Sequence, residues 1–322
     1  MLDFGTYPTP VDCLELLSSA ATTLWVKRDD LTNSLYGGSK LRKLGPLLED
    51  ALARGATKVV TIGAVGSHHV LATGVFGKRA GLSVEAVVLR QPQSPHVLET
   101  VRASIAQGVL LVPAASYAEA VRQLADRAAA GAYSIPVGGS NLLGTLGMVA
   151  AAFELAEQVR AGVLPEPDLL VVSLGSGGSA AGLAAGLLRA GLRTRVLAIA
   201  VAEPVKVFTH TACSLAKELV EQSARAAVLE RLAFDGRYLG DGYGRPTRNS
   251  ERATAEAARV GLTLDDTYTA KAFAAALDRV AAGQERHVLF WHTLSSAKMA
   301  PLLIGAPDEH ELDRELRRLA YG

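Results

Sequence analysis

The chain has 322 residues, of which 49% are hydrophobic and 20% are charged. This composition is that of an ordinary soluble α/β protein and excludes a disordered or fibrous chain. Because 33 basic residues stand against 32 acidic ones, no excess of positive charge draws the chain to nucleic acid or to an anionic membrane surface. We therefore expect small molecules and further copies of the chain as its partners.

The cysteines and the N-terminus bear on the cellular compartment. Cys13 and Cys213 are the only cysteines, a usage typical of reduced intracellular thiols rather than of a disulfide framework or a metal site. The N-terminus MLDFGTYPTP lacks the basic start and apolar run of a signal peptide, and we expect no stretch to reach the roughly 18 apolar residues of a membrane span. The expectation is a cytoplasmic protein with no metal site and no membrane segment.

From Lys40 onward, helical periodicity alternates with short β-branched runs. Strands are expected where apolar residues run continuously, and helices where they recur every three or four positions. In the first half we predict a helix over 40–55, a strand over 58–64, a helix over 67–81, a strand over 83–89, a helix over 96–108, a strand over 109–113 and a helix over 116–131.

A second block begins with a predicted helix over 141–162. A strand over 168–175, the helix after GSGGS and a strand over 194–201 form another βαβ unit. Residues 205–285 are expected to be mostly helical, and 287–292 to form one more strand. Buried strands separated by crossover helices imply parallel sheets flanked by helices. The two blocks suggest two such sheets in an α/β fold.

The turn in VVSLGSGGSAAGL is the first candidate site, and it consists of Gly175, Ser176, Gly177, Gly178 and Ser179. Glycines let backbone N–H groups approach an anion, and the following helix adds unsatisfied N–H groups and the positive end of its dipole. The motif is neither a P-loop nor a dinucleotide GxGxxG. Phosphate binding and a plain strand-to-helix turn are both open at this point.

The second candidate is LYGGSKLRKL, in which Gly37 and Gly38 set a tight loop and Lys40 opens a helix. The positive end of the helix dipole lowers the pKa of a lysine placed there and favours the neutral amine that forms a Schiff base. A solvated basic helix face is the alternative interpretation of KLRK. Lys40 alone does not decide between the two.

The third candidate is TIGAVGSHHVLATG, where a strand ends near Gly63 and a helix begins near Ser67. Ser67 is a candidate N-cap. Free amides at the helix start are equally a candidate site for a substrate carboxylate, with the Ser67 hydroxyl facing the reacting carbon. His68 and His69 are adjacent and point to different faces, so they make a poor metal pair and at most one is expected to face a site.

Together these segments resemble one family. The motifs TPV, KRDDLT, GGSKLRKL, TIGAVGSHH, SLGSGGSAAG, GDGYG, DDTYTAKAF and VLFWHT resemble the D-cysteine desulfhydrase and 1-aminocyclopropane-1-carboxylate deaminase family over nearly the whole chain. The resemblance implies a fold type II, tryptophan synthase β-like enzyme, with pyridoxal 5'-phosphate between two α/β domains. It implies a large cofactor-binding domain over 1–48 and 140–322, a small domain over 49–139, and a homodimer.

The resemblance also implies roles for individual residues. Lys40 matches the lysine that holds the cofactor as a Schiff base, and residues 175–179 match the loop that binds its phosphate. Ser67 matches a serine that binds the substrate carboxylate or assists at its carbon, and Tyr268 matches a proton shuttle or thiol-side base near the substrate. Thr293 matches a neutral partner of the pyridine nitrogen, which leaves the ring largely unprotonated and favours prompt elimination.

Three further residues are expected at the site. His68 stands where the family has an asparagine, and we expect it to contact the phenolate edge of the cofactor. His69 and, in GDGYG, Tyr243 are assigned to substrate binding.

Two other departures from the family pattern concern the substrate. Phe290 replaces a tyrosine that is typical of the aminocyclopropane carboxylate deaminases, which disfavours that reaction. Leu294, Ser295 and Ser296 follow Thr293 where the family has HTGG, so small residues beside the cofactor acquire side chains. The pocket is expected to be reshaped for another substrate.

These residues predict a pyridoxal phosphate-dependent lyase or deaminase that acts on a small amino acid. Lys40 removes the Cα proton, the β-substituent leaves, Ser67 holds the carboxylate, and Tyr268 stands near the leaving group. With D-cysteine the products are pyruvate, ammonia and sulfide. The alternatives are a divergent enzyme of a specialised pathway, which eliminates, replaces or racemises, and a non-catalytic protein that binds amino acid or cofactor.

Overall fold

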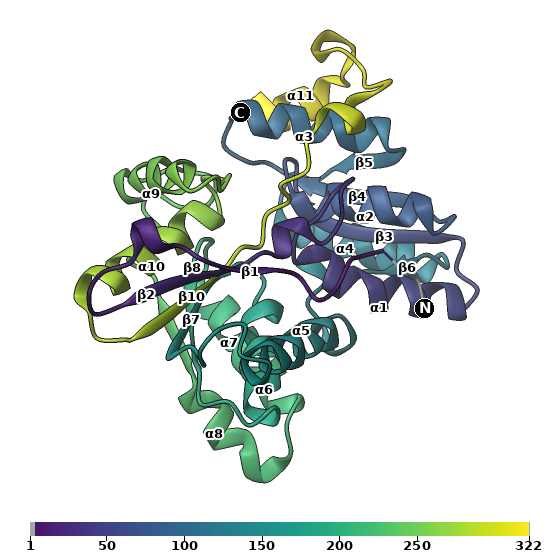
Figure 1. Cartoon of the computed structure of the whole chain (residues 1–322). Helices are drawn as coiled ribbons and strands as arrows, with labels where there is room; N and C mark the ends of the chain where they lie inside the picture. The colour runs from purple at the N-terminus through teal and green to yellow at the C-terminus, as the bar shows by residue number, and fades with distance from the viewer. Residues whose placement is uncertain (1–3, 322) are drawn as a thin grey trace.

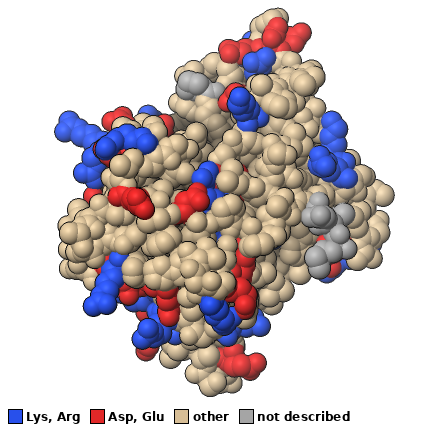
Figure 2. Space-filling model, in the orientation of Figure 1, with Lys and Arg blue, Asp and Glu red and all other residues tan. Residues whose placement is uncertain are grey.

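A computed structural model describes residues 4–321. The structure has two sheets, and helices flank each of them (Figure 1). This arrangement confirms the predicted α/β class. On the face seen in Figure 2, basic and acidic side chains are interspersed and leave wide uncharged areas between them. The chain has 33 basic and 32 acidic residues, and on that face they do not separate into one basic and one acidic region.

The larger sheet has six strands in the order β1-β2-β10-β7-β8-β9. Its neighbours are parallel except for the edge pair β1 and β2, which is antiparallel. The bounds are β1 Val11–Cys13, β2 Thr23–Lys27, β7 Leu169–Leu174, β8 Arg195–Ala200, β9 Leu232–Asp235 and β10 His287–Trp291. Residues 205–285 are mostly helical as predicted, and the four residues of β9 add an edge strand beside β8.

The smaller sheet has four parallel strands in the order β5-β4-β3-β6. The bounds are β3 Lys58–Ala64, β4 Ser83–Leu89, β5 Val109–Pro113 and β6 Tyr133–Ser134. The first three match the predicted strands, because continuous β-branched runs pack on both faces of a parallel sheet. The two-residue β6 is too short to leave such a pattern.

The helices begin and end close to their predicted positions. Their bounds are α1 Lys40–Ala53, α2 His68–Arg79, α3 Pro95–Ala106, α4 Tyr117–Ala129, α5 Leu142–Arg160, α6 Gly178–Arg189, α7 Val205–Glu218, α8 Arg225–Glu230, α9 Arg248–Arg259, α10 Thr269–Ala282 and α11 Arg314–Tyr321. Short 3₁₀ helices cover Glu15–Leu17, Asp29–Leu31, Val137–Gly139, Gln222–Ala224, Ala300–Leu303 and Glu309–Glu311.

Within residues 4–321, α5 is the one helix that is long and apolar enough to cross a membrane by length and composition. The helix meets this limit by its mean hydropathy and not as an unbroken apolar run, since it contains Thr145, Glu154 and Glu157. The helix packs in the core of the larger sheet, where Met148, Ala152 and Leu155 have no exposed surface. Its apolar residues lie against α6, so the fold explains its composition without a membrane.

The last helix, α11, lies beside α3 and β5 of the smaller sheet (Figure 1). Leu312 and Leu316 belong to the same hydrophobic cluster as Val97 and Val101 of α3. The chain therefore returns to the smaller sheet at its end. The division into 1–48 with 140–322 and 49–139 stays a prediction.

A buried carboxylate joins the start of α1 to strand β10. Asp29 has no exposed surface and accepts hydrogen bonds from Arg42 Nη2 at 2.7 Å, from Ser39 Oγ at 2.7 Å and from Trp291 Nε1 at 2.7 Å. Burial alone would raise the pKa of Asp29, but the charge and hydrogen bonds of Arg42 outweigh it and lower that pKa.

Glu154 of α5 is the second anion of this buried network. It accepts from Arg42 Nη1 at 2.9 Å and from Lys27 Nζ at 2.5 Å. Two buried cations and two carboxylates therefore share one network between β2, α1 and α5. Such a network costs desolvation energy, but it fixes the elements that contribute to it because each charge needs its partners.

Asp29→Ala is expected to lower the free energy of unfolding by about 3–5 kcal/mol, because Glu154 would be left alone to balance Arg42 and Lys27. Urea denaturation measures the change. The control is Arg259→Ala, which breaks an ion pair with Glu256 whose arginine side chain is 60% exposed and should cost at most about 1 kcal/mol. Similar losses in both variants would contradict the role of the buried network.

Candidate active site

A cavity of about 150 Å³ lies between the two sheets, where four helices begin. Lys40 is the first residue of α1, and Ser67, Gly177 and Tyr268 are the N-caps of α2, α6 and α10. All four line the cavity. Since each helix start carries partial positive charge, the cavity is suited to an anionic ligand. The caps of α1 and α6 make no side-chain hydrogen bond to their helices.

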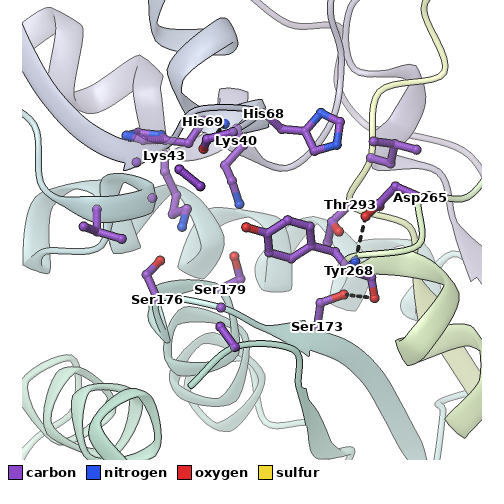
Figure 3. A pocket seen from close by; sticks show the side chains of 18 of the residues that line it. Lys40, Lys43, His68, His69, Ser173, Ser176, Ser179, Asp265, Tyr268 and Thr293 are labelled. Atoms are coloured by element: carbon purple, nitrogen blue, oxygen red, sulfur yellow. Dashed lines mark hydrogen bonds between the residues drawn. The ribbon is translucent and has the colours of Figure 1, made fainter. Parts of the chain in front are cut away.

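Lys40 points into the middle of this cavity (Figure 3). Its Nζ lies 5.7 Å from the centre of the Tyr268 ring. Burial lowers the pKa of Lys40, and the nearby charge of Asp265 offsets part of that effect. The direction agrees with the sequence prediction, but the main cause is desolvation rather than the helix dipole. The amine is thereby shifted toward the neutral, nucleophilic form.

The loop before Lys40 requires glycine. Gly38 has φ of +95°, and a Cβ there would lie 2.6 Å from the carbonyl oxygen of Thr293. Ser39 N–H donates to the same oxygen at 3.2 Å. The backbone of Thr293 therefore holds the turn that presents Lys40, and Thr293 itself lines the cavity.

The glycine-rich turn forms the opposite wall. Gly175, Ser176, Gly177 and Ser179 line the cavity, whereas Gly178 is not among the lining residues. Instead, Gly178 N–H donates to Ser140 Oγ at 3.2 Å. Four of the five residues predicted to bind phosphate therefore face the cavity directly.

A serine and a lysine that we did not predict, Ser140 and Lys43, lie beside this turn. Ser140 Oγ is 2.7 Å from Ser176 Oγ, and Lys43 Nζ donates to Ser140 Oγ at 3.2 Å. Figure 3 shows Lys43 and Ser176 pointing toward each other. Lys43 is only 2% exposed, and the described residues offer it no ion pair. Burial, followed by the charge of Lys40, lowers the pKa of Lys43 well below its ordinary value.

Ser67 is the N-cap of α2, as predicted, and its Oγ accepts from His69 N–H at 3.2 Å. The expectation that at most one of the two histidines faces a site is wrong, because both line the cavity. The cavity surrounds the start of the helix, so neighbouring side chains reach it on different sides. His69 lies toward Lys43, and His68 lies toward Asp265 (Figure 3).

The two histidines have different partners. His69 Nε2 is 2.9 Å from Thr61 Oγ1, and His68 Nδ1 is 2.7 Å from Tyr36 OH. Burial lowers the pKa of His69 well below its ordinary value, and burial with the neighbouring His96 lowers that of His68 to about 3. Both rings are therefore neutral at pH 7.

Tyr268 and Tyr243 form a pair in the cavity wall, with the Tyr268 ring centroid 6.4 Å from that of His68. Their hydroxyl oxygens are 2.8 Å apart. Burial raises the pKa of Tyr268 well above its ordinary value and that of Tyr243 to about 12. Both phenols are therefore protonated at pH 7. Tyr268 can donate a proton to an atom in the cavity, and the Tyr243 hydroxyl can then donate a hydrogen bond to the Tyr268 oxygen.

Asp265 positions Tyr268. Its carboxylate accepts from Tyr268 N–H at 2.6 Å, from Thr269 N–H at 3.1 Å and from Thr269 Oγ1 at 2.7 Å. Burial alone would raise the pKa of Asp265, but these bonds and the neighbouring His68 outweigh it and lower that pKa. The carboxylate is therefore ionised and caps α10 from within DDTYTAK. An Asp three residues before a helix cap is the signal that sequence reasoning missed.

Phe290 corrects an argument from the sequence. It has no exposed surface and packs against Phe273 with 4.9 Å between ring centroids. Because it belongs to the core of the larger sheet and not to the cavity lining, the missing hydroxyl at this position does not change the cavity wall. The replacement of a tyrosine by Phe290 is therefore no argument against deamination of aminocyclopropane carboxylate.

The sequence matches the family described as "Pyridoxal-phosphate dependent enzyme" over residues 2–293. The chain belongs to this family. Two similar proteins, from Pyrococcus furiosus and Pyrococcus horikoshii, are each named "Putative 1-aminocyclopropane-1-carboxylate deaminase". The first is 34% identical over 302 residues and the second 33% identical over 296, and each match covers 89% of both chains. The predicted resemblance is thereby confirmed.

Solved structures agree with this assignment. The "ACC deaminase homologue" has a TM-score of 0.77 at 30% identity, and the match covers 93% of this chain and 97% of that one. A "pyridoxal 5'-phosphate-dependent aspartate racemase" has a TM-score of 0.65 at 18% identity, with 91% and 92% covered. The second likeness is one of fold alone, and both match the predicted fold type II architecture.

The cavity fits the cofactor of this pyridoxal-phosphate dependent enzyme. Lys40 offers an amine of lowered pKa for the aldehyde, and the start of α6 offers N–H groups for the phosphate. Ser140, Ser176 and the unpaired Lys43 add hydrogen-bond donors at that end. An anion there would supply the negative charge that the buried Lys43 needs as its partner.

Gly177→Ala is expected to weaken binding of pyridoxal phosphate by about tenfold or more. Gly177 has φ of +93°, and a Cβ would lie 2.9 Å from Ala212 N, so the turn must shift. The control is Gly191→Ala at φ of +79°, where a Cβ meets nothing within 4 Å. Both variants carry the backbone strain of roughly 1–2 kcal/mol, but only the first should change the affinity measured by absorbance titration.

Lys43→Met is expected to stabilise the protein freed of cofactor at pH 7. The folded pKa of Lys43 lies far below 10.5, so between the two values the unfolded chain binds more protons and stability rises with pH. The advantage of the variant should therefore shrink as the pH approaches 10.5. Urea denaturation across this range measures it, with exposed Lys78→Met as control. A constant difference would contradict the buried charge.

Proposed function

We propose that this enzyme catalyses β-elimination from a small amino acid, as a D-cysteine desulfhydrase does, to give pyruvate, ammonia and sulfide. One observation carries the proposal: a lysine amine of lowered pKa and a protonated tyrosine pair lie against the same space, with Lys40 Nζ 5.7 Å from the Tyr268 ring. An amine on one side and a phenol on the other are the base and the acid that an elimination needs.

Lys40 is the proposed covalent anchor of the cofactor and the base for the substrate. Bound pyridoxal phosphate supplies a ring that withdraws electrons and stabilises negative charge at Cα. Once released by the incoming amino acid, the Lys40 amine removes the Cα proton. Ser67 and the N–H groups of α2 hold the carboxylate, and Thr293 is the proposed neutral partner of the pyridine nitrogen.

Tyr268 is the proposed acid at the leaving group. Its raised pKa keeps the phenol protonated, so it gives its proton to the departing thiolate and leaves sulfide as a neutral product. Tyr243, with its hydroxyl 2.8 Å away, stabilises the phenolate that remains. The ring centroids of His68 and Tyr268 are 6.4 Å apart. This contact favours His68, rather than His69, as the histidine nearer to the leaving group of the substrate.

Deamination of 1-aminocyclopropane-1-carboxylate is the second candidate. The names of the two Pyrococcus relatives and the position of Phe290 within the core favour it. This substrate has no hydrogen on Cα, so Lys40 would have to act at a ring carbon instead. A homodimer and a cytoplasmic location stay predictions.

The test of the cofactor site is borohydride reduction of the purified protein followed by peptide mapping. The expected result is a yellow protein whose reduced pyridoxyl group maps to Lys40 and is lost in Lys40→Ala but not in Lys78→Ala. Assays of pyruvate and 2-oxobutyrate then separate D-cysteine from the cyclopropane substrate. A label on another lysine would contradict the assignment.

Tyr268→Phe is expected to slow elimination from D-cysteine by about 10²–10⁴-fold, because the thiolate loses its acid. Elimination from β-chloro-D-alanine should change far less, since chloride leaves without a proton. Tyr243→Phe serves as the matched control and should have a smaller effect on D-cysteine. Equal losses with both leaving groups would show that Tyr268 is not the acid.

A further inference from the structure

A second and larger cavity, the outer cavity, adjoins the candidate active site. It has a volume of about 440 Å³. The two cavities share five lining residues, which form the junction between them: Tyr36, His68, Asp265, Leu294 and Ser295. The side chain of a substrate held at Lys40 would enter the outer cavity if it extended past these five residues.

The junction coincides with the departures of this chain from its family pattern. His68 stands in place of an asparagine, and Leu294 and Ser295 stand in place of two glycines. All three line both cavities. Ser295 Oγ also accepts from Gly37 N–H at 2.8 Å, which ties the junction to the loop before Lys40. The residues that distinguish this chain thus surround the path that a substrate side chain would take.

Histidines on this path carry no positive charge at pH 7. The rings of His68 and His96 lie 4.4 Å apart. Burial lowers the pKa of both. His68 Nε2 is buried without a hydrogen-bond partner among the described residues. The path therefore offers a free ring nitrogen but no cation.

The charged groups that line the outer cavity in the described part of the chain are carboxylates. They are Asp265 and Asp266, and the charge of Glu99 also reaches His96. No Lys or Arg is among the lining residues. The charge of the nearby Lys271 also reaches Asp266, but Lys271 does not line the outer cavity, and its Nζ donates to the carbonyls of Leu239 and Gly242 at 2.8 and 3.0 Å. The electrostatic potential in the outer cavity is therefore negative.

We infer that the outer cavity binds the side chain of the substrate, and that it selects β-substituted amino acids whose side chain ends in a cation over those that end in a carboxylate. This inference rests on the proposed elimination and names its substrate class. Asp266, exposed at the mouth of the outer cavity, is the specificity-determining residue, because Asp265 already caps α10 with its carboxylate.

The reaction of such a substrate balances without a further oxidant or reductant. For S-(2-aminoethyl)cysteine, Lys40 takes the Cα proton, the Cβ–S bond breaks, and Tyr268 gives its proton to the thiolate. Water then releases ammonia from the three-carbon product. The final products are pyruvate, ammonia and 2-aminoethanethiol.

The experiment compares three thioethers of similar length, each as both enantiomers: S-(2-aminoethyl)cysteine, S-propylcysteine and S-carboxymethylcysteine. Pyruvate formation gives kcat/KM, and the change in the visible spectrum of the holoenzyme gives the dissociation constant independently of turnover. We expect the cationic compound to exceed the anionic one by about tenfold or more in both measures. Equal values for the three compounds would overturn the inference.

Asp266→Lys should reverse the ranking of the cationic and anionic compounds, with both values expressed relative to D-cysteine in the same variant. The control is Asp126→Lys on α4, which makes the same change of net charge at an exposed residue that lines neither cavity. A reversal in both variants, or in neither, would contradict the role of Asp266.

The design separates this inference from the proposed function. If D-cysteine is not consumed but the thioethers bind in the expected order, the desulfhydrase proposal fails and the side-chain site stands. If D-cysteine is consumed and the order is absent, the side-chain site fails alone. If no amino acid changes the spectrum, both are wrong.

Discussion

The position of Lys40 depends on the buried carboxylate of Asp29. That single group accepts hydrogen bonds from Arg42 in the first turn of α1, from Ser39 at its cap, and from Trp291 at the end of β10. Because Ser39 donates to Asp29, it does not cap α1, and the start of the helix stays open toward the cavity. The ionic network thus fixes where the lysine stands and leaves the helix end available to a ligand.

The starts of α1, α2 and α6 around one cavity make a site that is unfavourable without an anion, whereas the start of α10 already has the carboxylate of Asp265. Lys40 and Lys43 add two amines to the same region, and burial lowers the pKa of both. A phosphate near Ser176 and a carboxylate near Ser67 would balance these partial and full charges. Uncompensated positive charge therefore destabilises the folded protein when no ligand is bound. Binding of a phosphate and a carboxylate would remove this destabilisation, which favours both groups as ligands.

The residues that depart from the family pattern lie at the boundary of the candidate active site. Lys40, the glycine-rich turn and Tyr268 keep the family pattern, and they surround the space where the chemistry is proposed to occur. His68, Leu294 and Ser295 depart from that pattern, and they line the junction with the outer cavity. The residues proposed to carry out the chemistry thus lie at the centre of the site, and the residues proposed to select the substrate lie at its edge.

The sequence by itself determined the α/β class and the strands β3, β4, β5, β7, β8 and β10, because periodicity is a local signal. It marked Lys40 and Ser67 as candidates beside glycine turns, and it assigned Tyr268 only through the resemblance to the family. Short strands such as β9 leave no such signal, since four residues are stable only beside β8. Only the tertiary structure brought Lys43 to Ser140, placed His68 and His69 on different sides, and put Phe290 in the core. Those contacts join segments far apart in the chain, and their geometry depends on packing that no local pattern encodes.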